Sequence, residues 1–323
     1  MSRAAVLCFH SVTTTNLAAA GSAHVAAESF KSFVGVARRL GEIVPLRELL
    51  RRRAEGRSTA GLIALSFDDA YAAVLNELAE FISRHAVPVT IFVTTDAAAA
   101  GAKFWWDRID DLFPRIGAER WRAFEDACGL PDSYRTGQPA SYGPLRPLRQ
   151  WLLAAHQGRW PDALEPVLEA LEKACGFQTA HRSMTFAEIA TMASLSEVEL
   201  GVHTASHPVL PLLPDDELRR EIETAHDELR ERFTNVLPVL AVPFGLYDQR
   251  MLRVARRAGM TASLTLAGTL RDSDDDGAVP RVCMTSGDTA ARLGLRLLGV
   301  SDFVRRWSGR GAALYPDLPS ATT

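Results

Sequence analysis

The chain has 323 residues, of which 47% are hydrophobic and 23% are charged, and its formal net charge is -3. This is the composition of an ordinary soluble globular protein, and the length fits one large α/β domain or two small ones. The small negative charge gives no reason to expect nucleic acid as a partner.

Cysteine usage and hydropathy exclude further classes of protein. The 4 cysteines are widely spaced and contain no CxxC pair, which argues against a disulfide scaffold and against a cysteine zinc site. No window is apolar over the length of a membrane span. The chain enters a strand-like run almost at once, without a charged leader and longer apolar core. We therefore find no secretion signal and expect a cytoplasmic protein.

Short apolar runs alternate with amphipathic segments along most of the chain. The predicted strands are residues 4–9, 62–67, 89–94, 199–202, 239–242 and 262–266. The predicted helices between them are residues 30–39, 72–84, 215–233 and 250–258. This alternation indicates an α/β fold with a parallel sheet, either a barrel or a doubly wound sheet. In both folds, ligands bind at the carboxyl ends of the strands.

The alternation stops between residues 103 and 182, which we predict to be a helical insertion within a single domain of residues 1–323. Most of the 6 tryptophans lie in it: Trp105, Trp106, Trp121, Trp151 and Trp160. Helical patterns cover residues 151–156 and 163–174, after a Pro- and Gly-rich linker at 131–147.

Two interpretations of these aromatic residues stay open. They either form the core of a small subdomain or offer stacking surfaces for sugar rings. The segment 104–107 follows a strand closely, so it is the piece that we expect to face the site. Trp105, Trp106 and Asp107 are accordingly candidate substrate-binding residues.

The last predicted element is a basic amphipathic helix at residues 290–310. Its apolar residues are spaced by 4, 3, 4 and 3 positions: Leu293, Leu297, Val300, Val304 and Trp307. The ordinary interpretation is a closing helix with its apolar face on the domain. A basic helix of this kind could instead bind an anionic membrane surface, which would make the protein peripheral to the inner membrane.

Polar side chains directly follow several predicted strands, namely His10, Asp68, Asp69 and His203. His203 and His207 are four residues apart, a spacing that places two imidazoles on one side of a helical turn, where they can hold one cation. Asp69 as a third ligand would leave an open position for water, as in a catalytic zinc site. Such a cation lowers the pKa of water and polarises a carbonyl, and Asp68 would be the base.

The reaction also requires a hydrogen-bond donor to the developing oxyanion and a general acid. The strand at 239–242 ends in a Pro-containing turn that exposes backbone N–H groups, such as that of Phe244, to a developing oxyanion. Pro243 and Tyr247 flank this turn and are candidate substrate contacts. The remaining strand-end histidine, His10, is our candidate for the general acid.

These residues resemble the polysaccharide deacetylases of carbohydrate esterase family 4, with their nodulation-factor (chitooligosaccharide deacetylase) homology domain. Ser66-Phe-Asp-Asp-Ala70 is similar to the family's T-F-D-D-G motif, and His203-Thr-Ala-Ser-His207 fits its H-[ST]-x-x-H motif. Pro243-Phe-Gly245 resembles the turn of the third motif. The resemblance implies a distorted (β/α) barrel with fewer than eight strands, and metal-dependent removal of an N-acetyl, sometimes O-acetyl, group from a sugar.

Carried over residue by residue, the resemblance makes Asp68 the base and Phe244 the oxyanion N–H. It makes Asp69, His203 and His207 the ligands of a divalent metal, with Zn²⁺ as the default and Co²⁺ or Ni²⁺ also accepted.

The chain departs from the family pattern at three points. Ala70 replaces a glycine, which is a minor change in a turn; the arginine that begins the third motif is missing; and the late L-x-H acid motif has no counterpart. Arg281, in a late Pro-Arg pair, could reach Asp68 instead. Family members that modify exopolysaccharides resemble this chain more closely, with an early histidine like His10 and a similar Pro-Arg pair.

The favoured function is therefore removal of an N-acetyl group from an amino sugar in a glycan, a glycolipid precursor or a glycoside. Two alternatives keep the same fold. One is a hydrolase of a non-sugar amide or cyclic imide, and the other is a non-catalytic carbohydrate-binding protein. The sequence leaves the oligomeric state open.

Overall fold

The computed structural model describes residues 3–14, 23–135, 145–266 and 277–299, and the statements below refer to these parts of the chain. Its centre is a parallel sheet with the strand order β10-β9-β8-β7-β6-β5-β1-β11. These strands are β1 (Ala5–Phe9), β5 (Leu62–Phe67), β6 (Val89–Val93), β7 (Val198–Val202), β8 (Val236–Ala241), β9 (Ala262–Thr265), β10 (Ala278–Pro280) and β11 (Val282–Cys283). Strand β4 (Glu42–Ile43) adds to β5, and β2 (Ser11–Thr13) pairs separately with β3 (His24–Ala26).

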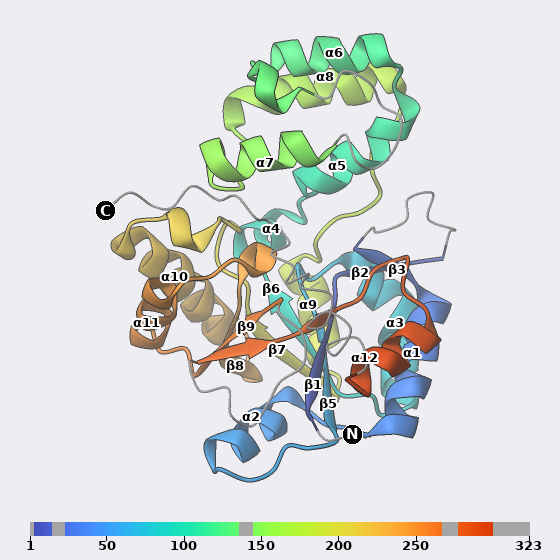
Figure 1. Ribbon diagram of the computed structural model, residues 1–323, viewed down its shortest axis with the longest axis vertical. Helices are drawn as coiled ribbons and strands as arrows, with labels where there is room; N and C mark the ends of the chain where they lie inside the picture. The colour runs from blue at the N-terminus through green and yellow to red at the C-terminus, as the bar shows by residue number, and fades with distance from the viewer. Residues whose placement is uncertain (1–2, 15–22, 136–144, 267–276, 300–323) are drawn as a thin grey trace.

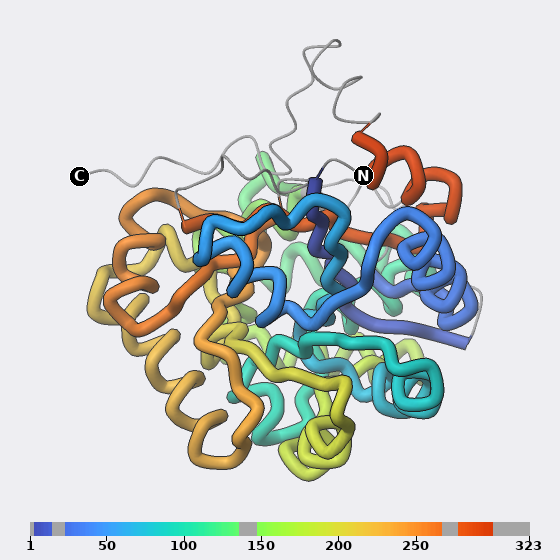
Figure 2. Tube along the Cα trace, turned by 90° about the horizontal axis from the view of Figure 1, so that it is seen from below, coloured from blue at the N-terminus to red at the C-terminus, as the bar shows by residue number. Residues whose placement is uncertain are grey.

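One segment of the chain closes the sheet into a barrel. β10 pairs with β9 and β11 pairs with β1, although only Arg281 separates these two short strands. The segment 278–283 therefore joins the two ends of the sheet, and Figure 2 shows the chain wound around the ring. The predicted distorted (β/α) barrel is confirmed, although its sheet order contains eight strands rather than the expected fewer than eight. The doubly wound sheet, which the alternation also allowed, is wrong.

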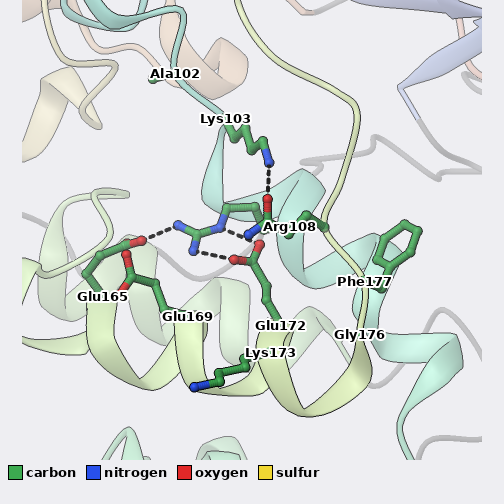
Figure 3. Close-up of a pocket in the computed structure, with 10 residues that line it drawn as sticks. Ala102, Lys103, Arg108, Glu165, Glu169, Glu172, Lys173, Gly176 and Phe177 are labelled. Atoms are coloured by element: carbon green, nitrogen blue, oxygen red, sulfur yellow. Dashed lines mark hydrogen bonds and ion pairs between the residues drawn. The ribbon is translucent and has the colours of Figure 1, made fainter.

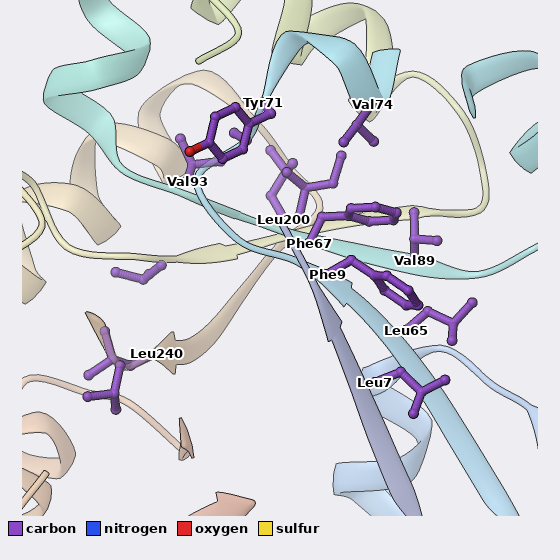
Figure 4. Close-up of a cluster of buried hydrophobic side chains, with 14 of the residues drawn as sticks. Leu7, Phe9, Leu65, Phe67, Tyr71, Val74, Val89, Val93, Leu200 and Leu240 are labelled. Atoms are coloured by element: carbon purple, nitrogen blue, oxygen red, sulfur yellow. The ribbon is translucent and has the colours of Figure 1, made fainter. Parts of the chain in front are cut away.

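Alternate residues of each strand pack on opposite faces, as the pleat of a strand requires. The outward residues of β5 join the main core between sheet and helices: Ile63, Leu65 and Phe67. Figure 4 shows this core around the same strands. Leu62 and Ala64 belong to a second cluster inside the ring. The inner row continues to Ser66 and Asp68, so the pleat itself directs Asp68 to the mouth of the barrel.

Helices cover the outside of the ring (Figure 1). They are α1 (Ala27–Leu40), α2 (Leu46–Ala54), α3 (Ala72–Arg84), α4 (Thr95–Ala100), α9 (Phe186–Ala193), α10 (Asp215–Arg232) and α11 (Gln249–Arg257). All of the predicted strands and barrel helices are present within a few residues of their expected bounds. The sequence missed the strands of two or three residues, because such short strands carry almost no periodic pattern.

The segment between β6 and α9 contains α5 (Trp105–Leu112), α6 (Ala118–Ala127), α7 (Leu145–His156) and α8 (Glu165–Cys175). These helices lie together beyond one end of the barrel (Figure 1) and share a hydrophobic cluster that includes Trp121 and Leu152. Helix α7 begins earlier than predicted, so Pro147 lies in a first helical turn rather than in a linker. Proline is tolerated there because the first N–H groups of a helix have no intrahelical partner.

The C-terminal helix is shorter than predicted. Helix α12 (Ala290–Leu297) buries Leu293 and Leu297 against the main core, as the ordinary interpretation of its apolar spacing required. It ends before Gly299, whose φ of 78° is left-handed and stops the helix. Residues 300–310 of the predicted helix lie outside the described residues. Across the described ranges, no helix is long and apolar enough to cross a membrane.

Candidate active site

Most of the predicted site residues line one cavity at the carboxyl ends of the strands, with a volume of about 340 Å³. Its walls include His10, Asp68, Asp69, His203, His207, Trp105, Trp106, Asp107 and Phe244. Because β1, β5 and β7 run parallel, their polar carboxyl ends meet at the same rim of the barrel.

Three buried side chains converge in this cavity. The Nε2 atoms of His203 and His207 each lie 3.5 Å from Oδ1 of Asp69. The Nδ1 atom of His203 lies 2.8 Å from the carbonyl oxygen of Ala241. A carbonyl can only accept, so Nδ1 carries the hydrogen and Nε2 turns its lone pair toward Asp69.

This donor set fits a divalent cation. Among the described residues, Oδ1 of Asp69, which both Nε2 atoms approach, is buried without a hydrogen-bond partner. Burial and the neighbouring Asp68 raise the pKa of Asp69, and burial lowers the pKa of both histidines. A divalent cation between the two neutral imidazoles and Asp69 would stabilise the ionised form of the carboxylate. It would also accept the lone pairs of the two Nε2 atoms and of Oδ1, which face one another.

The two histidines do not lie on a helical turn, so that part of the prediction is wrong. They follow β7 in an irregular loop in which Thr204 and His207 have left-handed φ values of 66° and 60°. The Oγ1 atom of Thr204 accepts a hydrogen bond from the backbone N–H of His207 at 3.0 Å. The two imidazoles therefore come together through an irregular turn that the hydroxyl of Thr204 stabilises by this hydrogen bond.

A carboxylate that the sequence did not single out holds this loop. Glu221, on α10, accepts hydrogen bonds from the backbone N–H groups of Ala205 at 3.1 Å and Ser206 at 2.9 Å. The insertion contributes Arg159, whose Nη2 donates to Glu221 at 2.8 Å. Helix α10 and the insertion together fix the turn between the histidines, and no local sequence pattern indicated this long-range support.

Left-handed backbone is concentrated at the site. Asp69, Ala70 and Phe244 have φ values of 65°, 49° and 57°. Such conformations in residues other than glycine cost roughly 1–3 kcal/mol each and tend to cluster at functional sites. Replacement of the family's glycine by Ala70 is therefore not the minor change that we expected, because the position requires a conformation that alanine resists.

Arg281 reaches Asp68, as the sequence allowed. Its Nη1 and Nη2 atoms donate to Oδ1 and Oδ2 of Asp68, both at 2.7 Å, and both side chains are buried. Burial alone would raise the pKa of Asp68, but the charge and hydrogen bonds of Arg281 hold it well below its ordinary value. An arginine on the closing segment thus replaces the one missing from the third motif, and Asp68 stays ionised beside Asp69.

His10 lies on the cavity wall, with Nδ1 buried and without a hydrogen-bond partner among the described residues. Burial lowers the pKa of His10 to about 4, so its ring is neutral at pH 7. A neutral imidazole can accept a proton, but it is a poor proton donor at that pH.

A second histidine in the cavity, His24, has a raised pKa, in contrast to His10. The Nε2 atom of His24, on β3, lies 2.7 Å from Oδ1 of Asp107. The hydroxyl of Tyr71 donates to Oδ2 of Asp107 at 2.5 Å and accepts from Nε1 of Trp106 at 3.0 Å. Burial lowers the pKa of His24, but the charge and hydrogen bond of Asp107 outweigh burial and raise it. The sequence missed His24 because β3 is only three residues long.

The tryptophans of the insertion divide between the two interpretations. Trp121 and Trp151 are buried in the insertion's own core. Trp106 faces the cavity, with its ring centroid 4.9 Å from that of His207 and 6.1 Å from that of Phe244. Trp105 also lines the cavity, and its Nε1 donates to the carbonyl of Gly158 at 3.0 Å.

Two candidate substrate contacts are not brought into the cavity. Pro243 is buried in the turn after β8, and Tyr247 is 38% exposed beyond it. Neither side chain belongs to the cavity wall. The ring of Phe244 does, in the left-handed turn that the sequence placed at the oxyanion.

A larger hollow of about 870 Å³ lies in the insertion, away from these residues (Figure 3). Its central cation, Arg108, is neutralised by Glu172, with Nε–Oε1 and Nη2–Oε2 distances of 2.9 and 3.0 Å, and by Glu165 at 2.5 Å. These ion pairs connect helices α5 and α8, so the charged groups of the larger hollow already have a structural role. The smaller cavity is therefore the candidate active site.

Comparisons with known proteins show which family and fold the chain resembles. A sequence model of the polysaccharide deacetylase family matches residues 155–263. The deacetylase PplD of Streptococcus pyogenes, solved in complex with acetate, is 13% identical and covers 91% of this chain and 98% of its own, with a TM-score of 0.58. IcaB from Ammonifex degensii is 16% identical, and the match covers 92% of this chain and 97% of IcaB with a TM-score of 0.59. The BpsB deacetylase domain from Bordetella bronchiseptica is 15% identical, and the match covers 87% of this chain and 95% of that domain with a TM-score of 0.51.

The barrel has the fold of solved polysaccharide deacetylases, and part of the sequence matches the model of that family. The predicted resemblance to that family is confirmed over residues 155–263, where the family model matches. No curated protein sequence matches the chain significantly. The matched segment includes His203 and His207 but not Asp68 or Asp69, so the roles of the two aspartates depend on the geometry described above.

Proposed function

We propose that the protein is a metal-dependent hydrolase that removes an N-acetyl group from an amino sugar. The observation that supports this most is the Asp69–His203–His207 cluster directly beside the Asp68–Arg281 pair in one cavity. Asp69, His203 and His207 would hold the divalent ion, which when bound would polarise the acyl carbonyl and lower the pKa of water. Zn²⁺ is the default ion for one carboxylate and two imidazoles, with Co²⁺ or Ni²⁺ as substitutes.

Residues of the chain supply the base and the oxyanion donor of the proposed reaction. Asp68 takes a proton from the attacking water, and Arg281 keeps its carboxylate ionised and oriented. The backbone turn at Phe244 supplies an N–H to the oxygen on which negative charge develops. The ring of Trp106 lies beside that of His207 and forms part of the cavity wall.

The leaving amine must receive a proton, and the cavity offers two histidines for this step. His10 was the candidate from the sequence. We propose instead that His24 is the donor, because Asp107 raises the pKa of His24 while burial lowers that of His10 to about 4.

Separate replacement of the two histidines tests this assignment. We expect His24→Ala to lower kcat by about 10²-fold or more, the usual effect of losing a general acid. In the wild type, kcat should fall as pH rises through the raised pKa of His24, and this alkaline limb should vanish in the variant. His10→Ala should retain the limb. If His10→Ala abolishes it instead, the sequence-based assignment is correct.

A sugar is the favoured substrate because two tryptophans line the cavity, and an indole face suits the apolar face of a pyranose. The alternative of a non-sugar amide uses the same base and ion but has no need of these surfaces. A cytoplasmic location, peripheral membrane contact and the precise glycan stay predictions; nucleotide-linked and lipid-linked amino sugars are the substrates within reach from the cytoplasm.

Acetate release tests the function. We expect enzyme stripped of metal to be inactive on N-acetylated sugars and to recover when Zn²⁺ or Co²⁺ is restored. The panel should contain chitooligosaccharides, nucleotide-linked N-acetylglucosamine and lipid-linked precursors, with simple N-acetyl amines as the non-sugar control. Acetate from the amines alone would favour the second hydrolase function. No acetate and no bound metal would favour a carbohydrate-binding protein.

A further inference from the structure

We propose that Cys8, His10 and Cys283 form a second cation site in the cavity, which takes a thiophilic divalent ion such as Zn²⁺ or Cd²⁺. One donor atom from each residue lies within 4.8 Å of the other two. This site is separate from the Asp69–His203–His207 cluster and goes beyond the proposed function. The absence of a CxxC pair had argued against any cysteine zinc site, but the fold brings together cysteines from opposite ends of the chain.

Strand geometry builds the site. Cys8 and Cys283 are register partners on the neighbouring parallel strands β1 and β11. Paired residues on adjacent strands point to the same face of a sheet, with a strand separation of about 4.8 Å. His10 comes two residues after Cys8, so the period of the strand turns it to that face as well. Cys283 and His10 both reach the cavity wall.

The distances fit a tetrahedral ion with modest adjustment. Zinc–sulfur bonds of about 2.3 Å place two sulfurs roughly 3.8 Å apart around one tetrahedral ion. The two sulfurs, which lie within 4.8 Å of each other, would therefore need to close by about 1 Å at most. Cys283 is only partly buried, and Nδ1 of His10 has no hydrogen bond to lose within the described chain. The fourth position would face the cavity and remain open to water.

Charge balance favours a soft divalent ion. The Asp68–Arg281 pair is already neutral, and Sγ of Cys8 lies 3.5 Å from Oδ2 of Asp68. Two thiols that release their protons to solvent and bind one divalent ion leave the net charge of the site unchanged. Arg281 lies two residues before Cys283. A hydrogen bond with Cys8 and the positive charge of Arg281 lower the pKa of Cys283, whereas burial raises the pKa of Cys8 against the effect of Arg281. A bound divalent ion would favour the thiolate of Cys8.

Binding at this site would affect the neighbouring reaction centre. The ion would occupy the lone pair of His10 and remove the Cys8 hydrogen bond to Asp68. We therefore expect Zn²⁺ to act in two stages. The first equivalent should activate the enzyme and an excess should inhibit it, with the inhibition depending on Cys283.

Cobalt titration of the reduced, metal-stripped protein tests the site without relying on turnover. The wild type should bind 2 equivalents, because the described chain offers two such donor groups, and one should show thiolate-to-cobalt charge-transfer absorption. Cys283→Ser should lose that absorption, and its second equivalent should bind about 10²-fold more weakly or worse, since loss of an outer-shell partner alone costs 10–100-fold. Cys175→Ser, a matched change of a partly buried cysteine in the insertion, should keep both properties.

Circular dichroism should show that Cys283→Ser is folded, and a thiol count should exclude a Cys8–Cys283 disulfide in the sample. Cobalt binding without thiolate absorption in the reduced wild type would overturn the proposal. So would an unchanged absorption in Cys283→Ser. Because these readouts need no substrate, failure to find a deacetylated sugar would leave them unaffected, and relief of zinc inhibition in active Cys283→Ser would support the site independently.

Discussion

Replacement of His203 or His207 by alanine is expected to abolish metal binding and to reduce acetate release by about 10³-fold or more. A cation in such a site contributes several kcal/mol of transition-state stabilisation, and each 1.36 kcal/mol corresponds to a factor of ten in rate. Both rings have Nε2 directed at Oδ1 of Asp69, so either deletion leaves only two ligands. Elemental analysis of the purified variants measures the loss directly.

A surface histidine provides the control for this prediction. His85, exposed at the end of α3, can be replaced by alanine with no expected effect on metal content or activity. Thermal unfolding should show that the His203 and His207 variants remain folded, since their barrel core is unchanged. Full metal occupancy in a folded His203→Ala protein would contradict the ligand assignment, even if activity fell.

Asp68→Asn is expected to retain the metal and to lose about 10²–10⁴-fold in kcat, because an amide cannot accept the proton from water. The same change should destabilise the protein. Removing one partner of a buried ion pair typically costs 3–5 kcal/mol, since the other charge stays buried without compensation. Here that charge is Arg281, which donates two hydrogen bonds of 2.7 Å to Asp68.

The double variant Asp68→Asn/Arg281→Met separates the two effects. It should recover much of the lost stability, because no uncompensated charge remains, while activity stays low. Urea unfolding and acetate release measure the two quantities on the same samples. Normal turnover in folded Asp68→Asn would remove Asp68 as the base. Equal instability of the single and double variants would show that the ion pair does not cause the loss.

The Asp68–Arg281 pair also predicts the sign of a pH effect. The pKa of Asp68 is lower in the folded protein than the ordinary value of about 3.9 that it has when unfolded. The pair therefore stabilises the fold fully above that value, and the contribution disappears as pH falls toward the folded-state pKa. The wild type should lose stability faster than the double variant below about pH 4.

Much of the barrel follows from local properties of the sequence. Buried parallel strands are continuous apolar runs, and each ends where polar residues begin, so β5 and β7 already locate Asp68, Asp69 and His203 at one rim. The alternation of strands and helices indicates the α/β class, and short motifs supply the chemistry of the ligands. These signals are local because they depend on burial and on strand and helix periodicity.

Contacts between distant segments decided the rest. Closure of the ring places Arg281 against Asp68 and Cys283 beside Cys8. The first contact was a possibility that the sequence offered by resemblance to a family, and the second had no signal in the sequence. The insertion likewise brings Trp106 to His207 and Arg159 to Glu221. Side-chain pairing across the fold depends on where the elements dock, and docking is set by the whole core rather than by any local pattern. The sequence by itself determined the class of fold and the candidate metal ligands, and only the tertiary structure decided which charges and thiols surround them.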